Sequence, residues 1–331
     1  MKKFAGIFAL LLLLMPLGGC APQDSRSSTF YMMDTLITVT LYTRNAEQAE
    51  AVSDECRAIL TELDSLWARQ NAASEIYRLN MSSTGADDLD ARTVALLQTA
   101  LQISEATDGA FDITVAPLVE LWNTCGEENR LPTTEEMTVL LASVGSEKLA
   151  LSEKSLLKND PNTKIDLGGI GKGAAISALI DHLENTDIQG GLVSFGSNVA
   201  VFGKKPNGED FHIALRDPKD ADASVGVLRL TGGEVLSVSG DYERYVTING
   251  ARYHHILDPS TGYPSDSGLA SVAVVTSDGA VADALSTALF VMGQARAMEF
   301  YHSNVYDFEA IFIGSDGMVT VTDGLTNSFS Q

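Results

Sequence analysis

The chain has 331 residues, of which 45% are hydrophobic, so it can bury a substantial core in one large domain or in two closely packed halves. Acidic residues outnumber basic ones by 44 to 22, and the formal net charge is −22. Because no basic patch is available to contact phosphates along a strand, this composition argues against a nucleic-acid-binding protein. The three cysteines support neither a disulfide framework nor a cysteine metal site.

The N-terminal segment has the layout of a secretory signal. Two lysines precede an apolar run over residues 4–17 that is too short to span a bilayer comfortably, and small residues stand just before Cys20. This arrangement resembles a bacterial lipobox, in which the cysteine is acylated and becomes the new N-terminus. A plain signal peptide is the alternative, and the position of the cysteine disfavours it. We predict a lipoprotein signal peptide over residues 1–19, a polar tether over 20–29 and a folded domain over 30–331.

The first half of the chain mixes extended and helical patterns. Alternating apolar and polar side chains over residues 35–42 predict a strand, and apolar spacing over 47–67 predicts an amphipathic helix. The other predicted elements are a short ordered connection over 74–80, helices over 90–107 and 134–144, and an extended stretch over 108–118. Cys56, on the amphipathic helix, is predicted to be a small buried apolar residue.

Residues 164–175 (KIDLGGIGKGAA) predict a short strand, a glycine-rich turn and a helix that starts near Ala174. The glycines let the backbone approach a ligand closely, and the free N–H groups at a helix start favour an anion. With Lys172 inside the turn, phosphate is the leading candidate ligand. A P-loop is excluded, because Asp166 stands where its first glycine is required. A Rossmann fingerprint fits poorly, and a turn that serves only packing stays open on this segment alone.

The second half is richer in strands. Short strands are predicted over residues 192–195, 199–202, 211–215, 226–230 and 269–275, with hairpins over 245–253 and 310–321. The first hairpin has Asn249 and Gly250 at its tip. An apolar helix is predicted over 280–292. Because strands and helices mix without regular βαβ alternation, the pattern favours an α+β fold.

Two pairs of side chains are candidates for chemistry. Asp283 and Thr287 stand four residues apart on the predicted helix 280–292, so a carboxylate and a hydroxyl share one face. Both are hard oxygen ligands suited to Mg²⁺ or Ca²⁺, although a polar stripe facing solvent explains the pair at least as well. His254 and His255 are adjacent, so in a strand one points inward and the other outward, which disfavours a shared metal ion.

Several motifs occur together in the order found in one family. They are Met33-Asp-Thr35, Ser74-Glu75 with Arg78-Leu-Asn80, and the segments 109–118, 165–173, 239–242, 255–264 and 282–287. From about Met33 to the C-terminus, the chain resembles the ApbE family of FAD:protein FMN transferases. The resemblance implies an α+β fold of mixed sheets with packed helices in a single large domain.

The resemblance also implies an activity and a set of site residues. Such enzymes use Mg²⁺, transfer FMN from FAD to a Thr or Ser hydroxyl of a target flavoprotein, and release AMP. Asp283 and Thr287 are implied as Mg²⁺ ligands through their side chains and Gly169 through its carbonyl, with Asp283 and His255 as candidates for proton transfer. The implied FAD contacts are Met33, Ala110, Phe111, Asp112, Asp166, Lys172 and Leu257.

The implied partners are FAD, flavoproteins of membrane redox complexes, and the bacterial cell membrane, which the protein would meet on its extracytoplasmic side through a lipid anchor on Cys20. Two positions depart from the family pattern. Asp34 replaces a usual glycine, and Gln70 stands where many members carry an aromatic residue that packs on the flavin nucleotide, with Trp67 one turn away. Two alternatives stay open: an Mg²⁺-dependent FAD pyrophosphatase that uses the same site, and a flavin-binding lipoprotein without turnover, which the Asp283/Thr287 pair disfavours.

Overall fold

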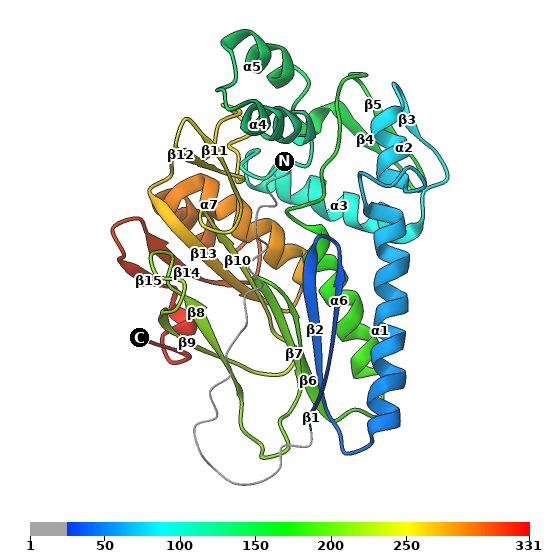
Figure 1. Ribbon diagram of the computed structural model, residues 1–331, viewed down its shortest axis with the longest axis vertical. Helices are drawn as coiled ribbons and strands as arrows, with labels where there is room; N and C mark the ends of the chain where they lie inside the picture. Colours follow the sequence, from blue (N-terminus) through cyan, green and yellow to red (C-terminus); the bar gives the residue numbers. More distant parts are fainter. Residues whose placement is uncertain (1–24) are drawn as a thin grey trace, which may run out of the picture.

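An eight-stranded sheet forms the centre of the protein, with strand order β1-β2-β6-β7-β10-β13-β14-β15 (Figure 1). The computed structural model describes residues 25–331, and every neighbouring pair in this sheet is antiparallel. The strands are β1 (Ser25–Met32), β2 (Thr35–Tyr42), β6 (Gly190–Phe195), β7 (Asn198–Gly203), β10 (Val235–Gly240), β13 (Leu269–Thr276), β14 (Glu309–Gly314) and β15 (Val319–Val321).

Helices cover one face of this sheet and build the lobe beyond its end (Figure 1). They are α1 (Ala46–Trp67), α2 (Glu75–Met81), α3 (Ala91–Ala106), α4 (Ala116–Glu128), α5 (Thr134–Leu141), α6 (Gly171–Glu184) and α7 (Gly279–His302). Helices α6 and α7 pack on each other and on β7, β10 and β13. The largest apolar core lies between these helices and the sheet and includes Phe195, Phe202, Phe290 and Phe312.

Smaller sheets complete the domain. Strand β9 (Ser224–Leu230) pairs with β8 (Phe211–Arg216) on one side and with β16 (Phe329–Ser330) on the other. Apolar side chains of this sheet pack with Val201, Leu236 and Ile311 of the main sheet in a second core. A third sheet contains β3 (Gly85–Ala86), β5 (Leu156–Lys158) and β4 (Leu149–Leu151). The hairpin of β11 (Tyr245–Ile248) and β12 (Ala251–His254) packs with α4 and α5 in a third core.

The predicted α+β fold in a single domain is confirmed. The strand over 35–42 has the predicted bounds, the amphipathic helix starts one residue earlier than predicted, and Cys56 is buried as a free thiol. At the tip of the β11–β12 hairpin, Asn249 and Gly250 have φ values of 50° and 82°, as a type I′ turn requires. The predicted end of the helix at residue 292 coincides with a break at Gly293, beyond which α7 continues to His302.

Strand β1 begins at Ser25, inside the segment predicted as tether, so residues 25–29 are strand. They pair with β2 in continuous register, and hydroxyl groups meet across the two strands at Ser27–Thr40 (2.9 Å) and Thr29–Thr38 (3.2 Å). The segment is polar because it is an edge strand with exposed side chains. A search for alternating hydrophobic residues therefore does not detect it. The predicted signal peptide and the lipidation site Cys20 lie outside the described residues.

Three segments differ in detail from the expected elements. The short ordered connection expected over 74–80 is helix α2, capped by the Ser74 side chain. The stretch 108–118 does not stay extended, because α4 starts at Ala116 with Pro117 in its first turn, where proline is well tolerated. β10, with two serines among its apolar residues, was not predicted as a strand.

The predicted strand over residues 164–166 is wrong. It is reduced to one bridge between Lys164 and Val115, since the side chain of Asn80 takes both backbone groups of Ile165 at 2.6 and 2.8 Å. Helix α6 then starts at Gly171 rather than near Ala174. Across residues 25–331, we find no helix with the length and apolar character needed to cross a bilayer.

Candidate functional site

The glycine-rich turn lies between Asp166 and the first turn of α6. Asp166 Oδ1 accepts a hydrogen bond from the Gly168 N–H at 2.7 Å, and its Oδ2 lies 3.1 Å from Nε of Arg69. A Cβ on Gly173 would lie 1.9 Å from the carbonyl oxygen of Gly279, so this glycine is required for the close approach of α6 to α7. The end of the turn therefore serves the packing of α6 on α7. The earlier part of the turn lies beside the candidate site.

Asp283 of α7 lies against the start of α6. Its side chain is almost fully buried, Oδ2 accepts a hydrogen bond from the Gly173 N–H at 3.0 Å, and Oδ1 lies 3.5 Å from Nζ of Lys172. Thr287 follows one helical turn later. A Cβ built on Gly169 would lie 3.5 Å from Thr287 Oγ1. The fold thus gathers the predicted metal ligands and the predicted phosphate-binding lysine in one place.

Hydroxyl groups surround Asp283 from the side of the sheet. Ser237 and Ser239 of β10 project from the same face of the strand toward α7, and Ser237 Oγ lies 3.3 Å from Asp283 Oδ1. Ser239 Oγ lies 2.8 Å from Ser286 Oγ and 3.3 Å from Thr287 Oγ1. Sequence reasoning missed these serines as site residues. Their signal was two serines at alternate positions within an apolar strand.

Asp112 lies beside the candidate site, but both oxygens of its carboxylate accept hydrogen bonds from other residues of the protein. Oδ1 accepts hydrogen bonds from the N–H and the hydroxyl of Thr114 at 2.7 and 2.6 Å, and Oδ2 accepts from the Ser146 N–H at 2.8 Å. Burial raises the pKa of Asp112. These bonds hold the 108–115 loop in place, and the loop carries Phe111, whose ring lies 3.2 Å from a Cβ built on Gly169. Ala110 and Phe111 are both buried.

His255 directly follows β12, and the charge of Lys172 acts on its ring. Its backbone N–H and its Nδ1 both lie 3.1 Å from the carbonyl oxygen of Arg244, so Nδ1 carries the proton and Nε2 is left as an acceptor. As predicted, the two histidines differ in direction: His254 is partly buried against Phe290, whereas His255 is exposed. Leu257, two residues on, is buried in the core with α4 and serves packing.

Met33 and Asp34 form the two-residue turn between β1 and β2, with φ values of 50° and 55°. Glycine adopts this left-handed conformation most easily, which explains the usual glycine at position 34, and aspartate tolerates it. The carbonyl oxygen of Asp34 accepts a hydrogen bond from Nη2 of Arg244 at 3.3 Å. Arg244 therefore connects this turn to the loop that carries His255.

Residues 33–312 match the profile of the ApbE family. The chain belongs to the ApbE family. The FAD:protein FMN transferase of Vibrio cholerae is 31% identical to it over 273 residues, which cover 81% of each protein. The enzyme of the same name from Haemophilus influenzae is 32% identical over 304 residues, covering 88% of this chain and 84% of the relative.

Solved structures agree with this assignment. The ApbE protein from Thermotoga maritima has a TM-score of 0.83 at 29% identity and covers 93% of this chain and 100% of its own. The flavin transferase ApbE from Vibrio cholerae has a TM-score of 0.81 at 26% identity, again covering 93% of this chain and 100% of that one. The resemblance in sequence is thus matched by a resemblance in fold.

The predicted Mg²⁺ ligands of this ApbE-family protein are all oxygen atoms. Within the described residues, no three or more His, Cys, Asp and Glu side chains gather as a metal site, and the predicted ligands include a single carboxylate, Asp283. Such a set fits Mg²⁺, which is commonly held by one or two carboxylates together with substrate phosphates. Thr287 on the same helix face and Gly169 beside it fit the remaining ligand roles.

Where many members of the family carry an aromatic residue, this ApbE-family protein has Gln70, and Trp67 one turn earlier does not take the place of that residue. Gln70 is exposed just after α1. Trp67 is buried, and its Nε1 donates a hydrogen bond to Thr93 Oγ1 at 3.2 Å, so its ring belongs to the core. Trp67 is therefore not available to stack on a nucleotide in this conformation.

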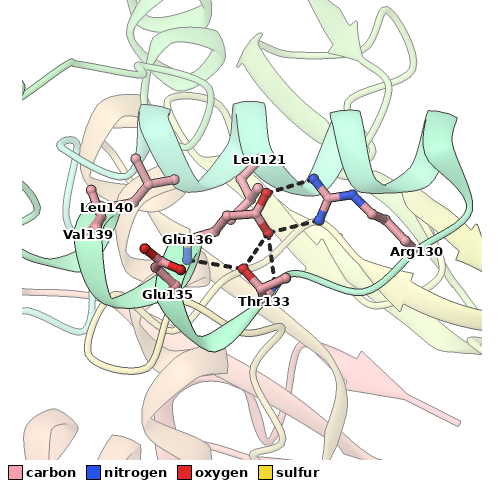
Figure 2. Close-up of a pocket in the computed structure, with 7 residues that line it drawn as sticks. All are labelled: Leu121, Arg130, Thr133, Glu135, Glu136, Val139 and Leu140. Carbon is pink, nitrogen blue, oxygen red and sulfur yellow. Dashed lines mark hydrogen bonds and ion pairs between the residues drawn. The ribbon is translucent and has the colours of Figure 1, made fainter.

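A separate groove of about 490 Å³ lies between α4 and α5 (Figure 2). It is lined by Leu121, Val139 and Leu140 on its apolar side. Arg130 and Glu136 form a two-bond ion pair at its edge, at 2.7 and 2.8 Å. None of the predicted site residues lines this groove, so it is distinct from the site at the start of α6.

The protonation of His255 gives a test of this geometry. Although solvent reaches part of the ring, the surrounding protein desolvates it, and this, with Arg244 and Lys172 nearby, lowers the pKa of His255 from 6.5 to about 4. The ring should therefore stay neutral at pH 5, while an unfolded histidine would be protonated. The stability linked to this ring is present above pH 6.5 and is lost as the pH falls toward 4. An NMR titration of the flavin-free protein, with His255→Gln to assign the signal, checks this; a His255 midpoint near 6.5 would contradict it.

Proposed function

We propose that this protein is an Mg²⁺-dependent FAD:protein FMN transferase, which moves FMN from FAD to a Thr or Ser hydroxyl of a target flavoprotein and releases AMP. Relatives that match over four fifths of the chain or more carry the name FAD:protein FMN transferase. The observation that carries the proposal is the meeting of Asp283, Thr287 and Lys172 at the start of α6. A buried carboxylate, a hydroxyl and a lysine are what a metal-bound pyrophosphate requires.

The residues have separate tasks in the proposed reaction. Bound Mg²⁺ supplies charge neutralisation at the pyrophosphate, and Asp283, Thr287 and the Gly169 carbonyl would hold it. Lys172 binds a phosphate oxygen, and His255 Nε2 accepts the proton of the acceptor hydroxyl. The hydroxyl oxygen bonds to the FMN phosphorus, and the bond from that phosphorus to the bridging oxygen breaks. AMP leaves with that oxygen and its electron pair.

A second candidate function is hydrolysis of FAD to FMN and AMP at the same site. The observation that favours it is the exposed Gln70 in place of an aromatic residue, together with the buried Trp67. Without a ring to order the nucleotide, water competes more easily with a protein hydroxyl for the FMN phosphorus. In this candidate the same metal and phosphate contacts operate, and only the nucleophile differs.

Incubation of the purified protein with FAD, Mg²⁺ and a flavoprotein that carries the acceptor threonine separates the two functions. Mass spectrometry should find the target heavier by one FMN, with AMP formed in equal amount, and a target whose acceptor threonine is replaced by alanine should gain nothing. Free FMN without an adduct would favour the pyrophosphatase. Neither product in the presence of Mg²⁺ would contradict both.

We also propose that the protein is anchored to the extracytoplasmic face of a bacterial cell membrane by lipid on Cys20, where it would meet flavoproteins of membrane redox complexes. The support is the order of two lysines, an apolar run and small residues before this cysteine. More than one acyl chain gives stable attachment.

The anchor predicts a clear effect of Cys20→Ser. The variant should leave the membrane fraction and accumulate as unprocessed precursor or in the medium, because the acylated residue is gone. Cell fractionation and the mass of the N-terminal peptide measure this, with Cys56→Ala as a control that removes a buried cysteine of α1. Continued membrane attachment of Cys20→Ser after loss of the signal would contradict the proposal.

A further inference from the structure

A buried polar cluster lies behind Asp283, where β7 and β10 are neighbours and α7 packs on β10 (Figure 1). It contains Asn198 of β7, Ser237 of β10 and Ser286 of α7, each at most 1% exposed. Ser237 Oγ lies 3.0 Å from Asn198 Oδ1, 3.2 Å from Ser286 Oγ and 3.3 Å from Asp283 Oδ1. A single hydroxyl therefore faces three possible acceptors with one proton to donate.

The amide of Asn198 decides where that proton goes. As placed, its oxygen faces Ser237, and its buried Nδ2 has no hydrogen-bond partner among residues 25–331, which is unfavourable for a buried donor. The oxygen and nitrogen of an amide differ little in shape, so exchanging them is a matter of hydrogen bonding. After exchange, Nδ2 donates to Ser237 Oγ. The unpartnered atom is then an oxygen, which proteins tolerate more often than an unpartnered N–H.

The remaining hydroxyl groups leave Asp283 as the acceptor for Ser237. Ser286 donates its own proton to the carbonyl oxygen of Asp283 at 2.9 Å, and it can accept from Ser239 at 2.8 Å. Between the neutral Ser286 oxygen and the ionised Asp283 oxygen, a hydroxyl donor gains more from the charged one. In this arrangement Asn198 Nδ2 donates a hydrogen bond to Ser237 Oγ, and the Ser237 hydroxyl donates one to Asp283 Oδ1.

We infer that Asn198 and Ser237 are positioning residues for Asp283, in which the Asn198 amide orients the Ser237 hydroxyl and that hydroxyl holds the carboxylate for a divalent cation. The inference rests on the Mg²⁺ site of the proposed function. Gly173 N–H fixes Oδ2 and Ser237 fixes Oδ1, so the carboxylate cannot rotate about its last bond without losing one of them. Partners that hold a metal-binding side chain in this way commonly change metal affinity by about 10–100-fold.

Titration of Mn²⁺ into the flavin-free protein, followed by the loss of the free-ion EPR signal, tests this inference. Ser237→Ala and Asn198→Leu should each weaken Mn²⁺ binding by about tenfold or more. Leucine matches asparagine in size but cannot donate a hydrogen bond. Ser143→Ala, which removes another buried serine hydroxyl at the end of α5, should leave the Mn²⁺ affinity unchanged. Melting curves in EDTA show that each variant is folded, and Asn198→Leu carries the test if Ser237→Ala is not.

The outcomes separate the inference from the proposed function. If Asn198→Leu leaves Mn²⁺ binding unchanged or tightens it, the amide accepts from Ser237 and the inferred order of protons is overturned. If both variants bind Mn²⁺ normally while Asp283→Asn does not bind it, the positioning role is overturned and the metal site stands. If Asp283→Asn binds Mn²⁺ as well as the native chain, the metal site of the proposed function itself is wrong.

Discussion

Asp283→Asn is expected to lower FMN transfer by at least about a thousandfold. The exchange keeps the size of the side chain and an acceptor for the Gly173 N–H, but it removes the only charged ligand of the proposed Mg²⁺. Charge neutralisation by a metal contributes several kcal/mol to such a reaction, and each 1.36 kcal/mol is a factor of ten in rate. The rate of adduct formation with saturating FAD, measured by mass spectrometry over a range of Mg²⁺ concentrations, gives the size of the loss.

Asp278→Asn is a matched control for this substitution. Asp278 lies on the same helix as its N-cap, where it accepts hydrogen bonds from the Ala280 and Val281 N–H groups at 2.8 and 3.2 Å, and asparagine is an equally good cap. The Asp278→Asn variant should retain near-native activity, although it loses the same negative charge as Asp283→Asn. Near-native FMN transfer by Asp283→Asn, in EDTA-treated samples restored with Mg²⁺, would mean that the metal is bound elsewhere.

Residues of the candidate site could be predicted from the sequence where their arrangement depends on spacing within one helix or turn. Asp283 and Thr287 share a face because four residues make about one helical turn, and that holds wherever the helix is placed. The pairing of Asn249 with Gly250 specified its hairpin for the same reason, since both residues tolerate positive φ. The motifs near these residues also supported the family assignment.

The rest depended on contacts between distant segments. Asp112 is one of the residues for which the family resemblance implies contact with FAD. One of its carboxylate oxygens accepts a hydrogen bond from the N–H of Ser146, 34 residues later, so its structural bonds could not be predicted from neighbouring residues. Residues 164–166 have a strand pattern, but Asn80 takes the backbone groups that a partner strand would need. Ser237 and Ser239 of β10 contact site residues only because α7 packs over this strand, which nothing in the neighbouring sequence indicates.

Lys172→Met is expected to weaken FAD binding by one to two decades. Lys172 is the second residue of α6, and its Nζ lies 3.4 Å from the Gly168 carbonyl oxygen and 3.5 Å from Asp283 Oδ1, so it can turn to a phosphate oxygen without leaving the site. A hydrogen bond to a charged group contributes roughly 1.5–3 kcal/mol, and about 1.4 kcal/mol corresponds to a tenfold change in Kd. Methionine keeps most of the length of the side chain and removes its charge.

The comparison of two ligands makes the Lys172 result specific. Riboflavin has the same ring system as FAD but no phosphate, so its Kd should hardly change in Lys172→Met, whereas the Kd of FAD should rise. Both constants can be measured by the quenching of flavin fluorescence. Lys164→Met is the matched control, because Lys164 lies eight residues earlier and pairs with Glu120 at 2.9 Å instead of facing Asp283. Equal losses for FAD and riboflavin would mean that the glycine-rich turn only supports the fold and that the pyrophosphate binds elsewhere.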